Sequence, residues 1–253
     1  MTINAPKATQ LTSLWDLWKN SFGDSDEFIE CFRRTAFSDR RCRCISIGDE
    51  TVASLYWFDC TYLGERVAYI YAVSTAEEYR GRGLGKKLME DTHEHLAQSG
   101  YAGAILVPSS PSLFEFYRNL GYATCSEIRE FTRLAEKAPI YIEEITAGEY
   151  TRLRKSLLPY GSVIQENESI DFLNTQARLY KGEDFILAAK TQGQTLCGAE
   201  LLGNTECARR IVSALGCYKG EFRTAGLGRP FAMYLPLKNY DSPAPSYFGL
   251  AFD

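Results

Sequence analysis

Three basic residues alternate with glycines in one short segment, Arg80-Gly81-Arg82-Gly83-Leu84-Gly85-Lys86. The segment stands between a strand-like run ending at Val73 and an amphipathic pattern typical of a helix. The first N–H groups of a helix lack intrahelical partners, and glycines let the backbone approach a ligand closely. With its cationic side chains, the segment therefore predicts a site for a pyrophosphate or a phosphorylated ribose.

Glycines at this spacing can also belong to a solvated strand-to-helix turn or to a nucleotide-binding motif. The turn stays open for a lone G-x-G. A P-loop requires G-x-x-x-x-G-K-[ST], and a dinucleotide fold requires G-x-G-x-x-G. Lys86 stands where the third glycine of the dinucleotide motif is needed. Neither nucleotide motif is met.

The spacing of Arg80, Gly83 and Gly85 fits the pattern Arg/Gln-x-x-Gly-x-Gly/Ala, and the segment resembles the signature of the GNAT superfamily of acyl-CoA-dependent N-acyltransferases. Residues 113–122 resemble the second motif of that family, a helix with a tyrosine that closes with glycine and an aromatic residue. Both motifs occur in the family's order. The resemblance covers about residues 10–134 and implies an α/β mixed-sheet GNAT fold with acetyl-CoA as co-substrate.

Individual roles follow from the resemblance by position. It implies that main-chain groups of Val73 and Thr75 bind the pantetheine arm. It also implies that Ser110 stands where many relatives have asparagine, which puts its bond to the cofactor in doubt. The pyrophosphate is expected on the N–H groups of Arg80, Gly81, Arg82, Gly83, Leu84, Gly85 and Lys86.

The same resemblance places Tyr117 near the thioester sulfur as the general acid. A phenol with a pKa of about 10 can donate to a leaving thiolate whose conjugate acid has a pKa of about 8.5. The alternative for Tyr117 is a core aromatic beside Phe114 and Phe116.

The attacking amine must lose a proton, and a free alkyl ammonium has a pKa of about 10.4, so a base or a desolvating pocket is required. Glu65, Glu77 and Glu78 flank the expected site, and we expect all three to be solvated. His93 and His95 are two residues apart on a helix, face different directions, and are expected at the surface.

The run 107–117 and the second half of the chain resemble the enhanced-intracellular-survival type of acetyltransferase, in which the C-terminal carboxylate serves as base. By position the equivalent is the terminal carboxylate of Asp253. Our hypothesis is that residues 246–253 fold back as a strand toward Tyr117. The alternative is an ordinary edge strand, because this chain is much shorter than those relatives.

Periodicity predicts the elements that position these residues. In the first half we expect two helices within the first forty residues, strands at 41–47, 52–58, 66–74, 103–108 and 122–134, and helices at 83–98 and 111–119. A polar stretch and Pro139 then favour a domain boundary, which gives a GNAT domain at 1–136 and a smaller, degenerate GNAT-like domain at 137–253.

The second domain is expected to repeat the order of elements. Helices are predicted at 149–158, 170–180 and 207–215, and strands at 140–145, 184–190, 195–202, near Glu221, at 231–237 and at 246–252. Gly203-Asn204-Thr205-Glu206 replaces the phosphate loop, and the G-x-G at Gly226 precedes a strand. We therefore expect that the second domain binds no cofactor and either forms one wall of the acceptor site or supports a homodimer.

Composition narrows the partners. The formal charge of −4 over 253 residues, without a long basic run, argues against nucleic acid. The eight cysteines form no C-x-x-C pair and only two histidines are present, so no metal site is indicated. No signal sequence or long apolar span is recognisable, which predicts a cytoplasmic protein without membrane contact. A small-molecule or peptide amine remains as the substrate.

Two functions stay open: an N-acetyltransferase that uses direct attack by a primary amine, and a CoA-binding regulatory or interaction module that has lost turnover. The enzyme is favoured because the loop and Tyr117 are both intact. Aromatic residues could line an apolar acceptor pocket or form core. They are Phe22, Phe28, Phe32, Trp57 and Tyr71.

Overall fold

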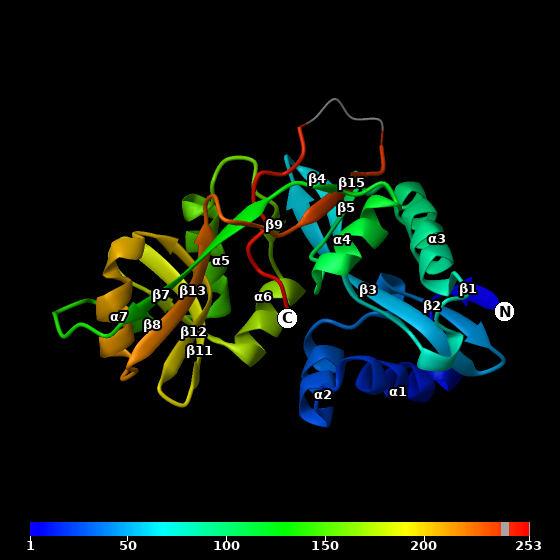
Figure 1. Ribbon diagram of the computed structural model, residues 1–253, viewed down its shortest axis with the longest axis horizontal. Helices are drawn as coiled ribbons and strands as arrows, with labels where there is room; N and C mark the ends of the chain where they lie inside the picture. The colour runs from blue at the N-terminus through cyan, green and yellow to red at the C-terminus, as the bar shows by residue number, and fades with distance from the viewer. Residues whose placement is uncertain (239–242, 253) are drawn as a thin grey trace. The chain divides into compact units, whose positions relative to one another are not determined.

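A computed structural model describes residues 1–238 and 243–252 (Figure 1). The chain divides into two compact units, Met1–Ala123 with Met233–Ser242, and Thr124–Ala232 with Pro243–Asp253. This division differs from the single boundary expected after residue 136. Segment 124–136 belongs to the second unit, and a strand from late in the chain belongs to the first.

The first unit is built on a mixed sheet with the strand order β1-β2-β3-β4-β5-β15-β6. Strands β4 and β5 pair in parallel, whereas β2–β3, β3–β4 and β5–β15 pair antiparallel. The strands are β1 (Thr2–Asn4), β2 (Cys42–Ile47), β3 (Glu50–Tyr62), β4 (Glu65–Thr75), β5 (Gly103–Leu106), β6 (Ala123–Thr124) and β15 (Met233–Pro236).

Helices cover both faces of this sheet. Side chains of β3 and β4 alternate between the two faces, so each face presents side chains that pack against helices. Leu55 and Trp57 face a core shared with α3 and α4, whereas Tyr56 lies against Trp18 of α1 and Phe32 of α2. The helices are α1 (Leu11–Phe22), α2 (Asp26–Thr35), α3 (Leu84–Gln98) and α4 (Pro111–Arg118), with short 3-10 turns η1 (Ala8–Gln10), η2 (Asp39–Arg41) and η3 (Glu77–Tyr79). The expected mixed α/β fold is confirmed.

The predicted strand at 231–237 is present as β15, but it lies beside β5 in the first sheet rather than in the second. Pro236 pairs with Gly103 and Tyr234 with Ile105. A Cβ on Gly103 would lie 2.1 Å from the Tyr234 hydroxyl, so the glycine makes room for the tyrosine ring. Packing between Gly103 and Tyr234, which are 131 positions apart in the sequence, thus decides the position of β15. Periodicity within the strand carries no information about this partner.

The second unit has a sheet with the order β14-β7-β13-β12-β11-β10-β8. The predicted strand 122–134 is split, because β6 ends at Thr124 and β7 pairs with β13 in this sheet. Its strands are β7 (Glu127–Leu134), β8 (Glu143–Glu144), β10 (Arg178–Lys181), β11 (Phe185–Gln192), β12 (Thr195–Gly203), β13 (Lys219–Ala225) and β14 (Arg229–Pro230). The short strand β9 (Ile164–Gln165) is also part of the second unit but lies outside this sheet.

The helices of the second unit repeat the arrangement of the first. Helix α7 (Ala208–Ala214), preceded by η4 (Thr205–Cys207), connects the parallel strands β12 and β13, as α3 connects β4 and β5. Helices α5 (Ala147–Leu157) and α6 (Glu168–Gln176) pack on the opposite face of the sheet from α7. The predicted helix 170–180 is shorter than expected, and its last residues form β10.

The C-terminal segment is extended, but it pairs at a single bridge rather than as the predicted strand 246–252. Tyr247 bridges Ser162, and its carbonyl accepts a hydrogen bond from the Val163 N–H at 2.9 Å. The side chain of Gln165 donates to the Leu250 carbonyl at 2.7 Å and accepts from its N–H at 3.3 Å. Side chains as well as backbone therefore hold this segment in the second unit.

A buried ion pair stabilises the core of the second unit. The Arg154 guanidinium donates to both carboxylate oxygens of Glu200, at 2.6 and 2.9 Å, and both side chains are essentially inaccessible to solvent. The hydroxyls of Tyr150 and Tyr247 also donate to Glu200, at 3.1 and 3.0 Å. One carboxylate therefore links α5, β12 and the C-terminal segment.

Replacing Arg154 with methionine is expected to destabilise the second unit by about 3–5 kcal/mol, because it leaves the Glu200 carboxylate buried without a cation. Hydrogen exchange of the β12 amides measures this effect, whereas Trp fluorescence would report on the first unit, which holds Trp15, Trp18 and Trp57. The control is Arg152→Met, on the same helix but 72% exposed. Equal protection of β12 in the two variants would contradict the prediction.

Candidate functional site

Strand β4 is irregular where it approaches the glycine-rich loop. Leu55 of β3 lies opposite two residues of β4, Ala72 and Val73, because the register shifts there, and Ala72 has a left-handed φ of 48°. Strands β4 and β5 pair only as far as Tyr69 and Ile105. Within the described residues, the part of β4 that contains Val73 and Thr75 therefore has no ladder with β5.

The side chains of the two loop arginines stabilise the loop itself. Arg80 Nε donates to the Thr75 carbonyl at 3.0 Å, and Arg82 Nη2 donates to the Glu78 carbonyl at 2.9 Å. The Arg82 guanidinium lies over the ring of Tyr79, 5.3 Å from its centroid. Both arginines are exposed, so they hold the loop against the end of β4 and also place positive charge beside it.

Gly83 is the N-cap of α3 and has a left-handed φ of 74°, as does Gly81. No side chain in the described part of the protein caps this helix, and the first intrahelical bond runs from the Lys87 N–H to the Gly83 carbonyl at 3.0 Å. The N–H groups of Leu84, Gly85 and Lys86 therefore have no acceptor among the described residues. The helix start can bind an anion at these amides.

The space around the loop is open where an anion would approach. A Cβ on Gly81 or Gly83 would meet nothing within 4 Å. A Cβ on Gly85 would lie 3.6 Å from Thr75 Oγ1 and 3.9 Å from the ring of Phe116. Helix α4, which carries Phe116, therefore adjoins the first turn of α3.

Tyr117 is largely buried, with 7% of its surface exposed, in the same core cluster as Leu84 at the start of α3. Its ring packs edge-on against Phe116 and Tyr122, with centroid distances of 5.1 and 5.8 Å. Its hydroxyl has no hydrogen-bond partner among the described residues. Burial raises the pKa of Tyr117 to about 12, so the phenol stays protonated at neutral pH. The residue is thus part of the core and also adjoins the loop.

Ser110 precedes α4 as its N-cap residue, but its side chain does not cap the helix. Its hydroxyl instead lies 3.0 Å from that of Ser112. Lys86, the last residue of the loop segment, forms an exposed ion pair with Glu90 at 3.7 Å. Neither side chain is committed to a buried partner that would keep it from a ligand.

The expectation for His93 is wrong. Instead of lying at the surface, His93 is half-buried, and its Nε2 lies 2.8 Å from the hydroxyl of Tyr122. Burial lowers the pKa of His93 to about 4, so the imidazole is neutral at physiological pH. The sequence around His93 gives no sign of its contact with Tyr122, because the two residues are 29 positions apart in the chain.

Other candidates for the chemistry lie apart from one another. Glu77 and Glu78 are exposed on η3, as expected, and Glu65 pairs with Lys238 at 3.3 Å. Asp253, the predicted base, lies outside the described residues. Within the described part of the chain, no group of three His, Cys, Asp or Glu side chains could hold a metal ion.

The five aromatic residues singled out in the sequence do not form one pocket. Phe32 and Tyr71 lie on the α1–α2 face of the sheet, with centroids 5.9 Å apart, beside Trp18. Trp57 faces the α3 side instead, where its Nε1 donates to the Tyr101 hydroxyl at 3.1 Å. The buried members form core on two faces, and Phe22 is 45% exposed.

The helix start after β12 in the second unit differs chemically from that after β4. The side chain of Asn204 accepts from the Glu206 N–H at 3.0 Å, and the Ala208 N–H donates to the Thr205 carbonyl. The Asn204 side chain also donates to Asp184 at 2.8 Å. Local groups therefore already occupy amides that would have to bind an anion.

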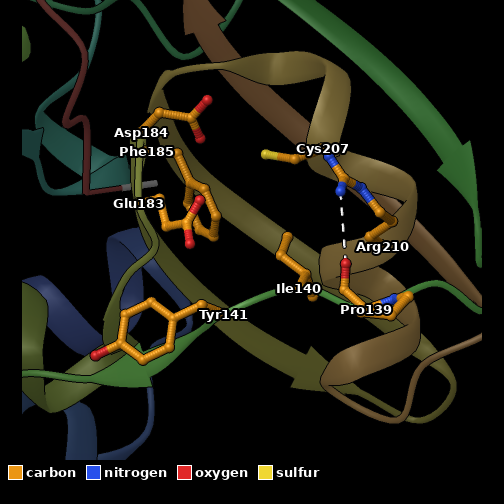
Figure 2. A pocket seen from close by; sticks show the side chains of 8 residues that line it. All are labelled: Pro139, Ile140, Tyr141, Glu183, Asp184, Phe185, Cys207 and Arg210. Atoms are coloured by element: carbon orange, nitrogen blue, oxygen red, sulfur yellow. Dashed lines mark hydrogen bonds between the residues drawn. The ribbon is translucent and has the colours of Figure 1, made fainter.

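A depression of about 510 Å³ lies beside this helix start (Figure 2). The carboxylates of Glu183 and Asp184 border it, and Arg210, on the opposite side, donates to the Pro139 carbonyl at 3.5 Å. Burial raises the pKa of Cys207 to about 11, so its thiol is protonated. The lining residues are Pro139, Ile140, Tyr141, Glu183, Asp184, Phe185, Cys207 and Arg210. With two carboxylates, this site is unsuited to a pyrophosphate.

The first half of the chain matches a known domain family. Residues 2–125 match the family model described as "Acetyltransferase (GNAT) domain". No curated protein matches the sequence. No helix among the described residues is long and apolar enough to cross a membrane.

Solved structures share the fold over most of the chain. A GCN5-related N-acetyltransferase from Kribbella flavida is 21% identical with a TM-score of 0.70, covering 93% of this chain and 72% of that one. One from Anabaena variabilis is 14% identical with a TM-score of 0.74, covering 94% and 73%. Eis1 from Mycobacterium abscessus is 12% identical with a TM-score of 0.65, covering 94% and 74%. At these identities the likeness establishes the fold alone.

We expect Tyr117 to remain un-ionised up to about pH 11, because its burial raises the pKa to about 12. A free phenol ionises at about pH 10. The measurement is the phenolate absorbance of the wild type minus that of Tyr117→Phe during an alkaline titration, with circular dichroism as a check on folding. The difference should stay flat through pH 10. A step of one phenolate near pH 10 would show that Tyr117 is solvated.

Proposed function

Because this chain belongs to the GNAT superfamily of acetyltransferases, we propose that it transfers an acetyl group from acetyl-CoA to a primary amine. The observation that carries the proposal is the start of α3, where three amides that find no acceptor in residues 1–238 and 243–252 lie beside Arg80, Arg82 and Lys86. Acyl transfer is the general chemistry of the family. Acetyl-CoA as the donor and an amine as the acceptor are the specific proposal.

Each part of the cofactor has a suitable counterpart. The diphosphate carries negative charge, which the helix start and the loop cations would stabilise. The pantetheine arm is extended and has two amides. It would align with the stretch of β4 around Val73 and Thr75, whose main-chain groups form no ladder with β5 in the part of the chain that the structure describes. Phe116 beside Gly85 places α4 next to the proposed diphosphate site.

The proposed reaction is direct attack. The amine nitrogen forms a bond to the thioester carbonyl carbon, which gives a tetrahedral intermediate. Collapse of this intermediate breaks the C–S bond and yields an amide and free CoA. The nitrogen loses one proton and the sulfur gains one, so no further reactant is needed.

Tyr117 would serve the leaving sulfur mainly as a hydrogen-bond donor. Its pKa of about 12 exceeds that of a thiol, about 8.5, so complete transfer of its proton would be uphill by about 5 kcal/mol. A hydrogen bond that strengthens as negative charge develops on sulfur avoids this cost. The proton that finally reaches the sulfur would be the one released by the amine.

The acceptor is proposed to be a small-molecule or peptide amine. After β12, the second unit has a carboxylate and an amide that is already bonded to Asn204, where the first unit has cations and unbonded amides after β4. This difference supports a role for the second unit without cofactor. We propose that this unit supports a homodimer.

Binding is tested by calorimetric titration with acetyl-CoA. We expect micromolar affinity for the wild type and a loss of at least about tenfold in Gly83→Val, because a side chain at φ 74° strains the loop and redirects the free amides. The matched control is Gly100→Val, which has a φ of 86° and open space at the other end of α3. Equal affinities for the two variants would argue against the helix start as the cofactor site.

Turnover is tested by release of CoA thiol in a screen of primary amines. Tyr117→Phe is expected to lower kcat by about 100-fold while the affinity for acetyl-CoA changes little, because the ring stays and only the donor is lost. Tyr160→Phe, at a residue 90% exposed, is the control. If the wild type binds acetyl-CoA but acetylates no amine, a CoA-binding regulatory module becomes the better description.

A further inference from the structure

A hydrogen bond connects α3 to the segment that follows α4. His93 Nε2 lies 2.8 Å from the hydroxyl of Tyr122, and their ring centroids are 5.4 Å apart. Tyr122 is 1% exposed, so its hydroxyl depends on a protein partner. His93 provides that partner from the third turn of the helix whose first turn carries the free amides.

Tyr122 in turn constrains Tyr117 in two ways. The Tyr122 N–H donates to the Tyr117 carbonyl at 3.1 Å, and the two rings pack edge-on with centroids 5.8 Å apart. The Tyr117 hydroxyl has no hydrogen bond of its own in the described part of the chain. The direction in which it points is therefore set by the rings around it, and Tyr122 is one of these.

The contact joins Tyr122 to a defined place along α3. His93 is ten residues after Gly83, which corresponds to about 15 Å along a helix that rises 1.5 Å per residue. The helix start and His93 thus lie on one rigid element. Because burial keeps His93 neutral, with its pKa lowered to about 4, the contact adds no charge beside Tyr117.

We propose that His93 is a positioning residue, which acts through Tyr122 to hold the phenol of Tyr117 at a fixed distance from the anion-binding start of α3. This inference rests on the proposed function, in which Tyr117 donates to the leaving sulfur. A cofactor bound by its diphosphate at one end of α3 presents its thioester at a distance fixed by its own length. The Tyr117 hydroxyl, as the hydrogen-bond donor to the sulfur, must be held at the matching position, and the pair His93–Tyr122 does so.

The test compares His93→Phe, His93→Gln and Tyr122→Phe with His95→Phe as the matched control. His95 is on the same helix but lies beside Trp57, with centroids 6.0 Å apart. We expect His93→Phe and Tyr122→Phe each to lower kcat about tenfold, with the Kd and KM for acetyl-CoA within twofold of wild type. Glutamine can still form the hydrogen bond, so His93→Gln should recover most of kcat.

The double variant His93→Phe/Tyr122→Phe is the sharpest comparison. If both residues act through one hydrogen bond, the double variant should be no slower than either single variant. Independent losses that multiply to about a hundredfold would overturn the inference. So would a parallel loss of acetyl-CoA affinity, because the histidine would then support the fold of α3 as a whole.

A readout without turnover separates this inference from the proposed function. In protein with 13C-labelled tyrosine rings, the Tyr117 signal, assigned with Tyr117→Phe, should shift in His93→Phe and stay unchanged in His95→Phe. An unchanged Tyr117 signal in His93→Phe would overturn the positioning role. Absence of acetyl transfer by the wild type would instead remove the proposed function, and full turnover in Tyr117→Phe would remove the donor role of Tyr117 on which this inference rests.

Discussion

The uncapped start of α3 is the constraint on which the rest of the first unit depends. Gly83 adopts a left-handed conformation that an L side chain rarely takes, and this conformation turns the loop into the helix. The consequence is a helix whose first amides find no acceptor among the described residues. Other parts of the unit hold this start in place: Leu84 is buried in the core, and Arg80 binds the last carbonyl of β4.

The second unit shows that this βαβ arrangement does not need the anion site. Its strands β12 and β13 and helix α7 repeat the crossover of β4, α3 and β5. Asn204 caps η4, the 3-10 turn that leads into α7, and Asp184 places a carboxylate beside it. The fold is therefore supported by packing against the sheet, whereas ligand chemistry depends on whether the first amides are already bonded.

The two units also stabilise their cores differently. In the first, an apolar core under α3 and α4 incorporates Tyr117, so its ring is held by the rings that surround it, and its hydroxyl makes no hydrogen bond to the described residues. In the second, a buried carboxylate on β12 accepts from Arg154 and two tyrosines. A buried network of this kind is costly to break, and through Tyr247 it fixes the C-terminal segment to the unit.

By itself the sequence determined what depends on neighbouring residues. The sequence predicts correctly the glycine-rich loop at Gly81–Gly85, the helix that follows it and most other strand and helix positions. It can do so because periodicity and turn chemistry act over a few residues. Only the tertiary structure decided the partners of β7 and β15, the split of the strand 122–134 and the contact between His93 and Tyr122. The position of β15 beside β5 depends on the packing of Tyr234 over Gly103. The burial of His93 depends on Tyr122, which belongs to another part of the chain. Both join residues far apart in the chain, where local patterns report nothing.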